Sequence, residues 1–360
     1  MCVAFFTLEH HDYALILCSN RDEYLSRPTE FAHFHSFETQ GHLRHGILQD
    51  QQPGQCPTQH SQYSDTVVLS GIDVQAGGTW LGLAKTGKLA LLTNITEDTA
   101  LKFPQSRGHL VASFLANPPS SLTDLTDIEQ YLRGLVGPFD LTDEGGARYA
   151  GFNLLLLSPR VTCSSASPSP LISYEAYLAT NRGASGQITY RPLTHVERQY
   201  GGLSNGSDGY GGKEWIKVKK GLEILRTVVK GPDHSEDKII EELFELLTWT
   251  SPTPPTSRAE LCNTIQVDPI LFRPGNIGAG YYATRLATVI LVKRTGEVVF
   301  IERDRWMLPD EAKSNAERKQ GSEWSGDRSR QGEERGERKP VLASTLSSAT
   351  QRVYRFKLDM

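Results

Sequence analysis

The feature that most constrains this 360-residue chain is a strand pattern that begins at its second residue. Val3–Thr7 is short, apolar and rich in β-formers, Glu9–Asp12 is a polar turn, and Tyr13–Cys18 is a second apolar run. These runs predict an antiparallel hairpin that places the chain terminus beside the end of the second strand. The next residues, 19–29, read SNRDEYLSRPT and carry five ionisable side chains. This strand end is therefore either a solvated turn or part of a site.

The rest of the chain predicts many strands and few helices. Further strands are expected at Thr66–Gly71, Thr79–Ala84, Leu89–Asn94, Asn153–Leu157, Tyr174–Thr180, Gln187–Arg191, Ala287–Val292, Val298–Glu302 and Arg352–Leu358. Helices are expected at Arg107–Ala116, Asp127–Leu135, Lys213–Val229 and Asp237–Trp249. This order favours an α+β protein with stacked antiparallel sheets and helices outside them.

Two segments break this pattern. Residues 36–65 are polar with little periodicity, which predicts a loop insertion. Residues 306–345 are dense in Glu, Arg, Lys, Ser and Gly, which predicts a disordered insertion that acts either as a solvated linker or as an interaction tail. We therefore predict a single domain formed by residues 1–305 and 346–358.

Composition excludes several classes of function. A net charge of -4 gives no reason to expect nucleic-acid binding. No apolar run approaches the roughly 20 residues of a transmembrane helix, and the N-terminus lacks the pattern of a secretory signal. The five cysteines include no CxxC pair, which indicates reduced thiols and a cytoplasmic protein. The pairs His33/His35 and His42/His45 have ligand-like spacing, but no Cys or carboxylate cluster completes them, so we predict no metal site.

Cys2 is the first candidate for chemistry. Removal of Met1, which precedes a small residue, would put a thiol and a free α-amine on Cys2. An α-amine has a reference pKa of about 7.7–8.0, so its neutral form can take the thiol proton. The alternative is that Cys2 is simply a small apolar residue that starts a strand.

Four other residues would complete an acyl-transfer site. Asp22, at the end of the second strand, could hold the α-ammonium, and Asn94 and Asn205 could donate hydrogen bonds to an oxyanion. Arg285 could stabilise the site electrostatically or bind an acidic group of the substrate. Asn is also a common turn residue, and an isolated arginine is usually a surface residue.

The chain resembles the NRDE family, the group of the transport and Golgi organisation proteins. The resemblance covers residues 1–35, 66–305 and about 350–358. The motifs that carry it are Met1-Cys2, Asn20-Arg-Asp-Glu23, Ser26-Arg-Pro28, Gly77-Gly-Thr-Trp-Leu-Gly82, Gly151-Phe-Asn153, Asn181-Arg-Gly183, Gly202-Leu-Ser-Asn205 and Thr284-Arg285.

This resemblance implies a four-layer αββα fold similar to that of N-terminal-nucleophile hydrolases. It implies Cys2 as nucleophile, Asp22 orienting the amine, Asn94 and Asn205 near the oxyanion, and Arg285 supporting the site. The hydrolases read Arg-Asn-x-Asp at the end of their second strand, whereas this chain reads Ser19-Asn-Arg-Asp22. Strand alternation could then aim Arg21 away from Cys2, which leaves open whether Arg21 lowers the thiol pKa.

Three functions follow from these observations. The first is a cysteine hydrolase that acts on amide or thioester bonds of a small acyl substrate and requires no cofactor. The second is a non-enzymatic carrier for haem or a lipid, with Cys2 as a thiolate ligand; Cys56-Pro57 resembles haem-regulated segments, or is an ordinary loop cysteine. The third is a scaffold in secretory trafficking that binds through residues 308–340. The resemblance links all three to Golgi organisation, protein secretion, lipid homeostasis and haem trafficking, with association to Golgi or mitochondria and peripheral membrane contact.

Overall fold

The structure is a computed structural model of the whole chain. The residues described are 2–37, 66–96, 103–117, 127–136, 148–164, 167–183, 186–231, 235–273, 279–309, 339–343 and 351–359. The predicted insertion 36–65, with His42, His45 and Cys56, lies almost entirely outside them.

Within these residues, two large sheets are antiparallel throughout. The first sheet has the order β10-β1-β2-β12-β13-β16, with β11 also paired to β12, and the second has the order β3-β4-β5-β6-β7-β8-β9. The first is formed by β1 (Val3–Thr7), β2 (Tyr13–Tyr24), β10 (Gly201–Leu203), β11 (Ile270–Phe272), β12 (Gly280–Lys293), β13 (Glu297–Asp304) and β16 (Gln351–Lys357). The second is formed by β3 (Thr29–His35), β4 (Val68–Asp73), β5 (Leu81–Ala84), β6 (Leu89–Asn94), β7 (Phe152–Ser164), β8 (Ser167–Thr180) and β9 (Thr189–Pro192).

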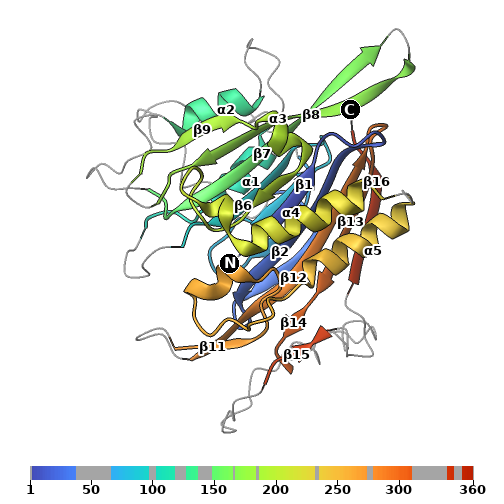
Figure 1. Ribbon diagram of the computed structural model, residues 1–360. Helices are drawn as coiled ribbons and strands as arrows, with labels where there is room; N and C mark the ends of the chain where they lie inside the picture. The colour runs from blue at the N-terminus through green and yellow to red at the C-terminus, as the bar shows by residue number, and fades with distance from the viewer. Residues whose placement is uncertain are drawn as a thin grey trace, which may run out of the picture.

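Helices cover the outer faces of both sheets and complete four layers. Helices α4 (Ile216–Val229) and α5 (Glu236–Leu247) pack on the first sheet and lie in front of it in Figure 1. Helices α1 (Gly108–Ala116) and α2 (Asp127–Leu135) pack on the second sheet. A short α3 (His195–Gln199) joins β9 to β10, and the 3₁₀ helices η2 (Gly212–Glu214) and η3 (Ala259–Asn263) flank α4 and α5 in the sequence. The four-layer αββα arrangement confirms the expected fold class.

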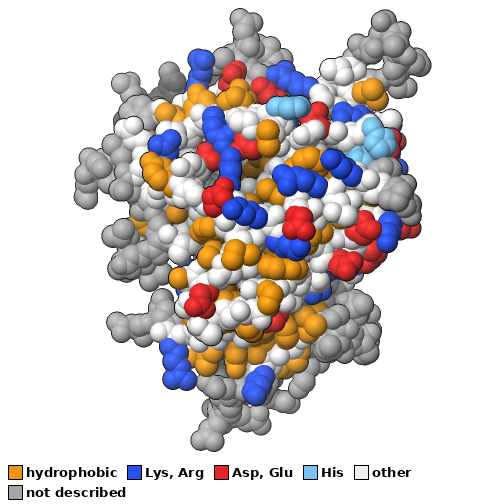
Figure 2. Space-filling view, in the orientation of Figure 1, with side chains coloured by type: hydrophobic (Ala, Val, Ile, Leu, Met, Phe, Trp, Pro, Cys, Tyr) orange, Lys and Arg blue, Asp and Glu red, His pale blue; other side chains and the backbone are white. Residues whose placement is uncertain are grey.

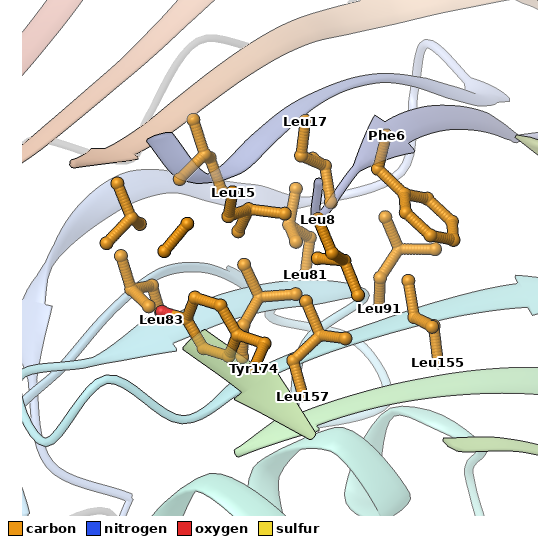
Figure 3. Close-up of a cluster of buried hydrophobic side chains, with 14 of the residues drawn as sticks. Phe6, Leu8, Leu15, Leu17, Leu81, Leu83, Leu91, Leu155, Leu157 and Tyr174 are labelled. Carbon is orange, nitrogen blue, oxygen red and sulfur yellow. The ribbon is translucent and has the colours of Figure 1, made fainter. Parts of the chain in front are cut away.

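The central strands of each sheet are buried on both faces, which explains their continuous apolar runs. Leu155 and Leu157 point into the core between the two sheets, where they meet Leu15 and Leu17 of β2 (Figure 3). Leu154 and Leu156 point the other way, toward α1 and α2. The outer face carrying α4 and α5 shows basic and acidic side chains interspersed (Figure 2), as expected for a solvated layer.

The predicted hairpin is confirmed, but the second strand is longer than expected. β1 pairs with β2, with Val3 opposite Asn20, and β2 continues through the polar run to Tyr24. The strand does not end at Asp22 because β12 pairs with this segment, with Asp22 opposite Thr284 and Tyr24 opposite Tyr282. The sequence also did not indicate β3, which begins at Thr29.

The C-terminal part of the chain returns to the first sheet. β16 pairs with β13, which confirms the expected last strand. Two short strands, β14 (Trp306–Met307) and β15 (Val341–Leu342), pair at the two ends of the predicted charged insertion. Residues 310–338 lie outside the described part, so the nature of that insertion stays a prediction. Among the described helices, none has both the length and the apolar character needed to cross a membrane.

Candidate functional site

The candidate nucleophile lies at the start of β1, between two neighbouring strands. β1 pairs with β2 on one side and with β10 on the other. The hydroxyl of Ser204, directly after β10, donates a hydrogen bond to the Cys2 carbonyl oxygen at 3.0 Å. Cys2 is half-buried and reduced. Pairing and this hydrogen bond therefore hold its backbone on both sides.

The Cys2 sulfur lies against the polar run of β2. Burial raises the pKa of the Cys2 thiol, while a hydrogen bond from the Asp22 N–H and the charge of Arg21 act to lower it. The register with Val3 opposite Asn20 places Cys2 opposite Arg21, and opposed residues of an antiparallel pair share one face of the sheet. The sequence left open whether strand alternation turns Arg21 away from Cys2. The pairing of β1 with β2 places the two residues on the same face of the sheet.

Arg21 is held in place by the second sheet. Its guanidinium stacks on the Trp80 ring at 3.9 Å from the centroid and donates a hydrogen bond to Thr29 Oγ1 at 3.0 Å. Burial lowers its pKa, and the charges of Glu23 and Cys2 oppose that change. Trp80 belongs to the Gly-Gly-Thr-Trp motif, whose Gly77 and Gly78 have φ values of 71° and 73° that favour glycine.

The Asp22 carboxylate is oriented by β12. Thr284 Oγ1 donates a hydrogen bond to Asp22 Oδ1 at 2.6 Å and accepts one from the Val267 N–H at 2.8 Å. The Tyr282 hydroxyl donates to the Asp22 carbonyl oxygen at 3.0 Å. Asp22 is 4% exposed, so these bonds fix its position inside the protein.

The two asparagines lie together, next to the segment that holds Cys2. Asn205 Nδ2 donates a hydrogen bond to the Asn94 carbonyl oxygen at 2.5 Å. Asn205 directly follows Ser204, the residue bonded to Cys2. Asn94 is half-buried at the end of β6, whereas Asn205 is 3% exposed. The structure thus brings both residues to the start of β1, although they are far apart in the sequence.

Two residues to which sequence reasoning gave no role anchor this segment. Thr93 Oγ1 donates to the Ser204 carbonyl oxygen at 2.7 Å. Asn153 Nδ2 donates to the carbonyl oxygens of Ser204 and Gly206, at 3.1 and 2.9 Å. The Gly-Phe-Asn motif was the only signal for Asn153. Its position shows that the motif ties β7 to the turn that carries Ser204 and Asn205.

Arg285 supports the site from a bulge in β12. The register between β12 and β2 shifts between Thr284 and Leu286, which places Arg285 at the irregularity. Its guanidinium donates to the carbonyl oxygens of Leu25 and Arg27, at 3.2 and 2.5 Å. Arg285 is 4% exposed, and its charge also acts on Arg21. It therefore holds the segment that follows the polar run of β2.

Lys217 was not indicated by the sequence. It lies in the first turn of α4 and is fully buried. Its ammonium interacts electrostatically with Asp22, Cys2 and Cys262. The helical spacing gave no signal, because a lysine next to apolar positions normally extends into solvent.

One cluster in the described part has the composition of a metal site. His10, His11 and Asp12 bring ligand atoms within 4.8 Å of one another in the turn between β1 and β2. His10 Nδ1 accepts hydrogen bonds from the N–H groups of Asp12 and Tyr13, and His11 forms an ion pair with Asp12 at 2.8 Å. The His33 and His35 rings lie with their centroids 4.9 Å apart and tilted by 39°, and His35 is hydrogen-bonded to Ser70. The contacts of His10 and His11 stabilise the turn between β1 and β2, and those of His33 and His35 stabilise the pairing of β3 with β4.

A small cavity lies between the sheets beside Ser204. It measures about 30 Å³ and is lined by Phe6, Leu155, Leu178, Leu203 and Ser204, among others. Pockets for small molecules usually measure about 300–1,000 Å³. In this conformation the cavity has room for one or two waters.

The sequence as a whole matches one family. Residues 1–51 and 55–307 match the model described as Transport and Golgi organisation 2. The chain belongs to this family. The Transport and Golgi organization protein 2 homolog of Bos taurus is 29% identical over 84% of this chain and 92% of its own length. The Homo sapiens homolog is 28% identical over the same shares.

Two solved structures are also similar to the chain. An N-acylethanolamine-hydrolyzing acid amidase ortholog of Caenorhabditis elegans aligns with a TM-score of 0.38 and 8% identity, over 81% of this chain and 92% of that one. A mutant conjugated bile acid hydrolase of Clostridium perfringens aligns with a TM-score of 0.35 and 9% identity, over 99% and 97%. At these scores neither alignment adds to what the layers and the strand register already show.

Proposed function

We propose that this protein is a cysteine N-terminal-nucleophile enzyme that cleaves an amide or thioester bond of a small acyl substrate. The observation that carries the proposal is the position of Cys2, which the strand register places on the same sheet face as Arg21, where the Asp22 backbone N–H and the Arg21 charge both act to lower the thiol pKa. A hydrogen bond and a cation directed at one sulfur both favour its thiolate form. A cysteine that only fills space at the start of a strand needs neither.

The reaction begins once Met1 has been removed. A thiol with a reference pKa of about 8.5 is mostly protonated at neutral pH, so it needs a base, and the freed α-amine belongs to the same residue. As this amine takes the thiol proton, the sulfur attacks the carbonyl carbon and forms a C–S bond. The scissile C–N or C–S bond then breaks, and the amine passes its proton to the leaving group. Water hydrolyses the acyl-enzyme, releases the acid and restores the thiol.

The oxyanion of the tetrahedral intermediate needs preorganised donors. Asn94 is half-exposed at the end of β6, and Asn205 has a second N–H besides the one bonded to Asn94. Their support from Thr93 and Asn153 limits the motion of these donors. We assign Asn94 and Asn205 to the oxyanion, Asp22 to the α-amine, and Arg285 to the support of the segment after β2.

The test is an intact-mass measurement of the purified protein before and after a small thiol-directed acylating probe. Wild type is compared with Cys2→Ala and with Cys262→Ala, which removes another half-buried thiol. We expect a mass without Met1 and one fast adduct that is lost in Cys2→Ala and kept in Cys262→Ala. A panel of N-acyl amides and acyl thioesters then identifies the bond that is cleaved.

Retained Met1, or a Cys2 that reacts no faster than Cys262, would overturn the enzyme proposal. The alternative is then a carrier of haem or a lipid, with a role near Golgi membranes that the family name supports. Haem titration followed by the Soret band, in wild type and Cys2→Ala, tests that alternative.

A further inference from the structure

A buried lysine lies beside the start of β1. Lys217 is in the first turn of α4, and its side chain is 0% exposed. One turn later, α4 touches β1 closely, since a Cβ on Gly221 would lie 2.0 Å from the Phe5 ring. Residues four apart share a helix face, and helical side chains lean toward the N-terminus. Lys217 therefore extends along β1 toward Cys2, and in Figure 1 the chain start lies by α4 and η3.

The groups around Lys217 are consistent with a side chain that extends toward the start of β1. The Lys217 ammonium lies 5.6 Å from the centroid of the Trp215 ring, which belongs to the residue preceding α4. Asp22 on β2, Cys2 before β1 and Cys262 on η3 interact with it electrostatically. Each of these groups comes from a different element around the start of β1.

The charged residues of the neighbouring η2 helix interact elsewhere. Lys213 forms an ion pair with Glu197 at 2.5 Å, and Glu214 forms one with Lys219 at 2.5 Å. Asp22 and the two thiols are therefore the charged or titratable partners described for Lys217, and the charge of Arg21 acts on Cys2.

A buried ammonium is costly, and its surroundings partly compensate for the cost. Burial lowers the pKa of Lys217, and the charges of Asp22, Cys2 and Cys262 oppose that change. An apolar residue of similar length would fill the same space without this cost. The position therefore favours a function for the charge itself.

We propose that Lys217 is a positioning residue of the reaction centre, whose charge balances Asp22 around the Cys2 thiol and α-amine. This inference rests on the proposed function, since it concerns the same nucleophile. The negative charge of Asp22 favours the protonated thiol and the protonated α-amine. The positive charge of Lys217 offsets that effect, so both groups of Cys2 lose their protons at lower pH.

The experiment is the pH profile of Cys2 alkylation by iodoacetamide, followed on the N-terminal peptide by mass spectrometry. Lys217→Met removes the charge, Lys217→Gln is a second neutral variant if methionine disturbs packing, and Lys217→Arg keeps the charge. Lys219→Met is the matched control, since this lysine of the same helix is 61% exposed. Near-ultraviolet circular dichroism checks that each variant is folded.

We expect both neutral variants to move the midpoint of the profile upward by about one pH unit, as for loss of a nearby opposite charge. Lys217→Arg and Lys219→Met should stay close to wild type, and Asp22→Asn should move the midpoint downward. An unchanged midpoint in a folded neutral variant, or in Asp22→Asn, would overturn the inference. Alkylation of Cys2 can be measured even if Met1 is retained and even if no substrate is cleaved. A failure of the proposed enzyme function is therefore distinguishable from a failure of this inference.

Discussion

Replacing Thr284 by valine tests whether β12 holds the Asp22 carboxylate. The two side chains have nearly the same shape, so the substitution removes a hydroxyl and little else. That hydroxyl donates to Asp22 Oδ1 at 2.6 Å and accepts from the Val267 N–H at 2.8 Å, and Thr284 is 0% exposed.

The magnitude follows from these two bonds. A buried hydrogen bond to a charged group contributes about 1.5–3 kcal/mol, and one between neutral groups about 1 kcal/mol. We expect Thr284→Val to lower the free energy of unfolding by about 3 kcal/mol. For a chain of this length, that corresponds to a fall of about 4 °C in the unfolding temperature.

The assay is differential scanning calorimetry of Thr284→Val beside Thr288→Val. Thr288 lies on the same strand and is 3% exposed, but its hydroxyl takes part in none of the described hydrogen bonds. Its replacement should leave the stability within about 1 kcal/mol of wild type, or raise it. Equal losses in the two variants would refute the assignment of Thr284 as the support of Asp22.

Two further predictions concern packing and acid stability. Gly221→Ala should destabilise by about 1–3 kcal/mol, because the added methyl group would meet the Phe5 ring. Gly134→Ala, in a helix with nothing within 4 Å of the added group, should stabilise by about 0.5–1 kcal/mol. Urea unfolding measures the free energy of unfolding of both variants. A change of the same sign in both would contradict the packing argument. Burial disfavours the charged form of Glu197, but hydrogen bonds from Arg191 and other donors outweigh it and hold the pKa of this carboxyl well below its usual 4.5. Its contribution to stability is present above that value and is lost as the pH falls. Arg191→Gln should therefore unfold at lower temperature at pH 7 and show a shallower decline between about pH 5 and pH 3; a wild-type slope would exclude this contribution.

Much of the architecture could be predicted because it depends on local pattern. The runs that form β1 and β2 and the polar turn between them are contiguous, so their pairing requires no distant partner. The hairpin in turn places Asp22 near Cys2. The helices over Asp127–Leu135 and most of Lys213–Val229 follow from the spacing of apolar residues, and the structure has them as α2 and α4.

Other features depend on partners that the sequence does not name. The continuation of β2 to Tyr24 requires β12, which lies more than 250 residues away in the chain. The support of Cys2 by Ser204 joins residues 202 positions apart. The composition of SNRDEYLSRPT is polar, which by itself does not predict a strand. These residues form a strand because a neighbouring strand provides hydrogen-bond partners for their backbone groups.

The pattern of the sequence by itself thus determined the stacked antiparallel sheets with outer helices and the hairpin that begins the chain, because hydrophobic periodicity and chain order are local properties. The four layers and the role of Cys2 as nucleophile were implied by the family resemblance. Only the tertiary structure decided the direction of Arg21, since a change of one residue in register moves a side chain to the other face of a sheet. Only the tertiary structure placed Lys217 beside Cys2 and Asp22. A lysine at a helix start is buried or exposed according to what packs against the helix, and here α4 packs against β1 and η3 and Lys217 is fully buried.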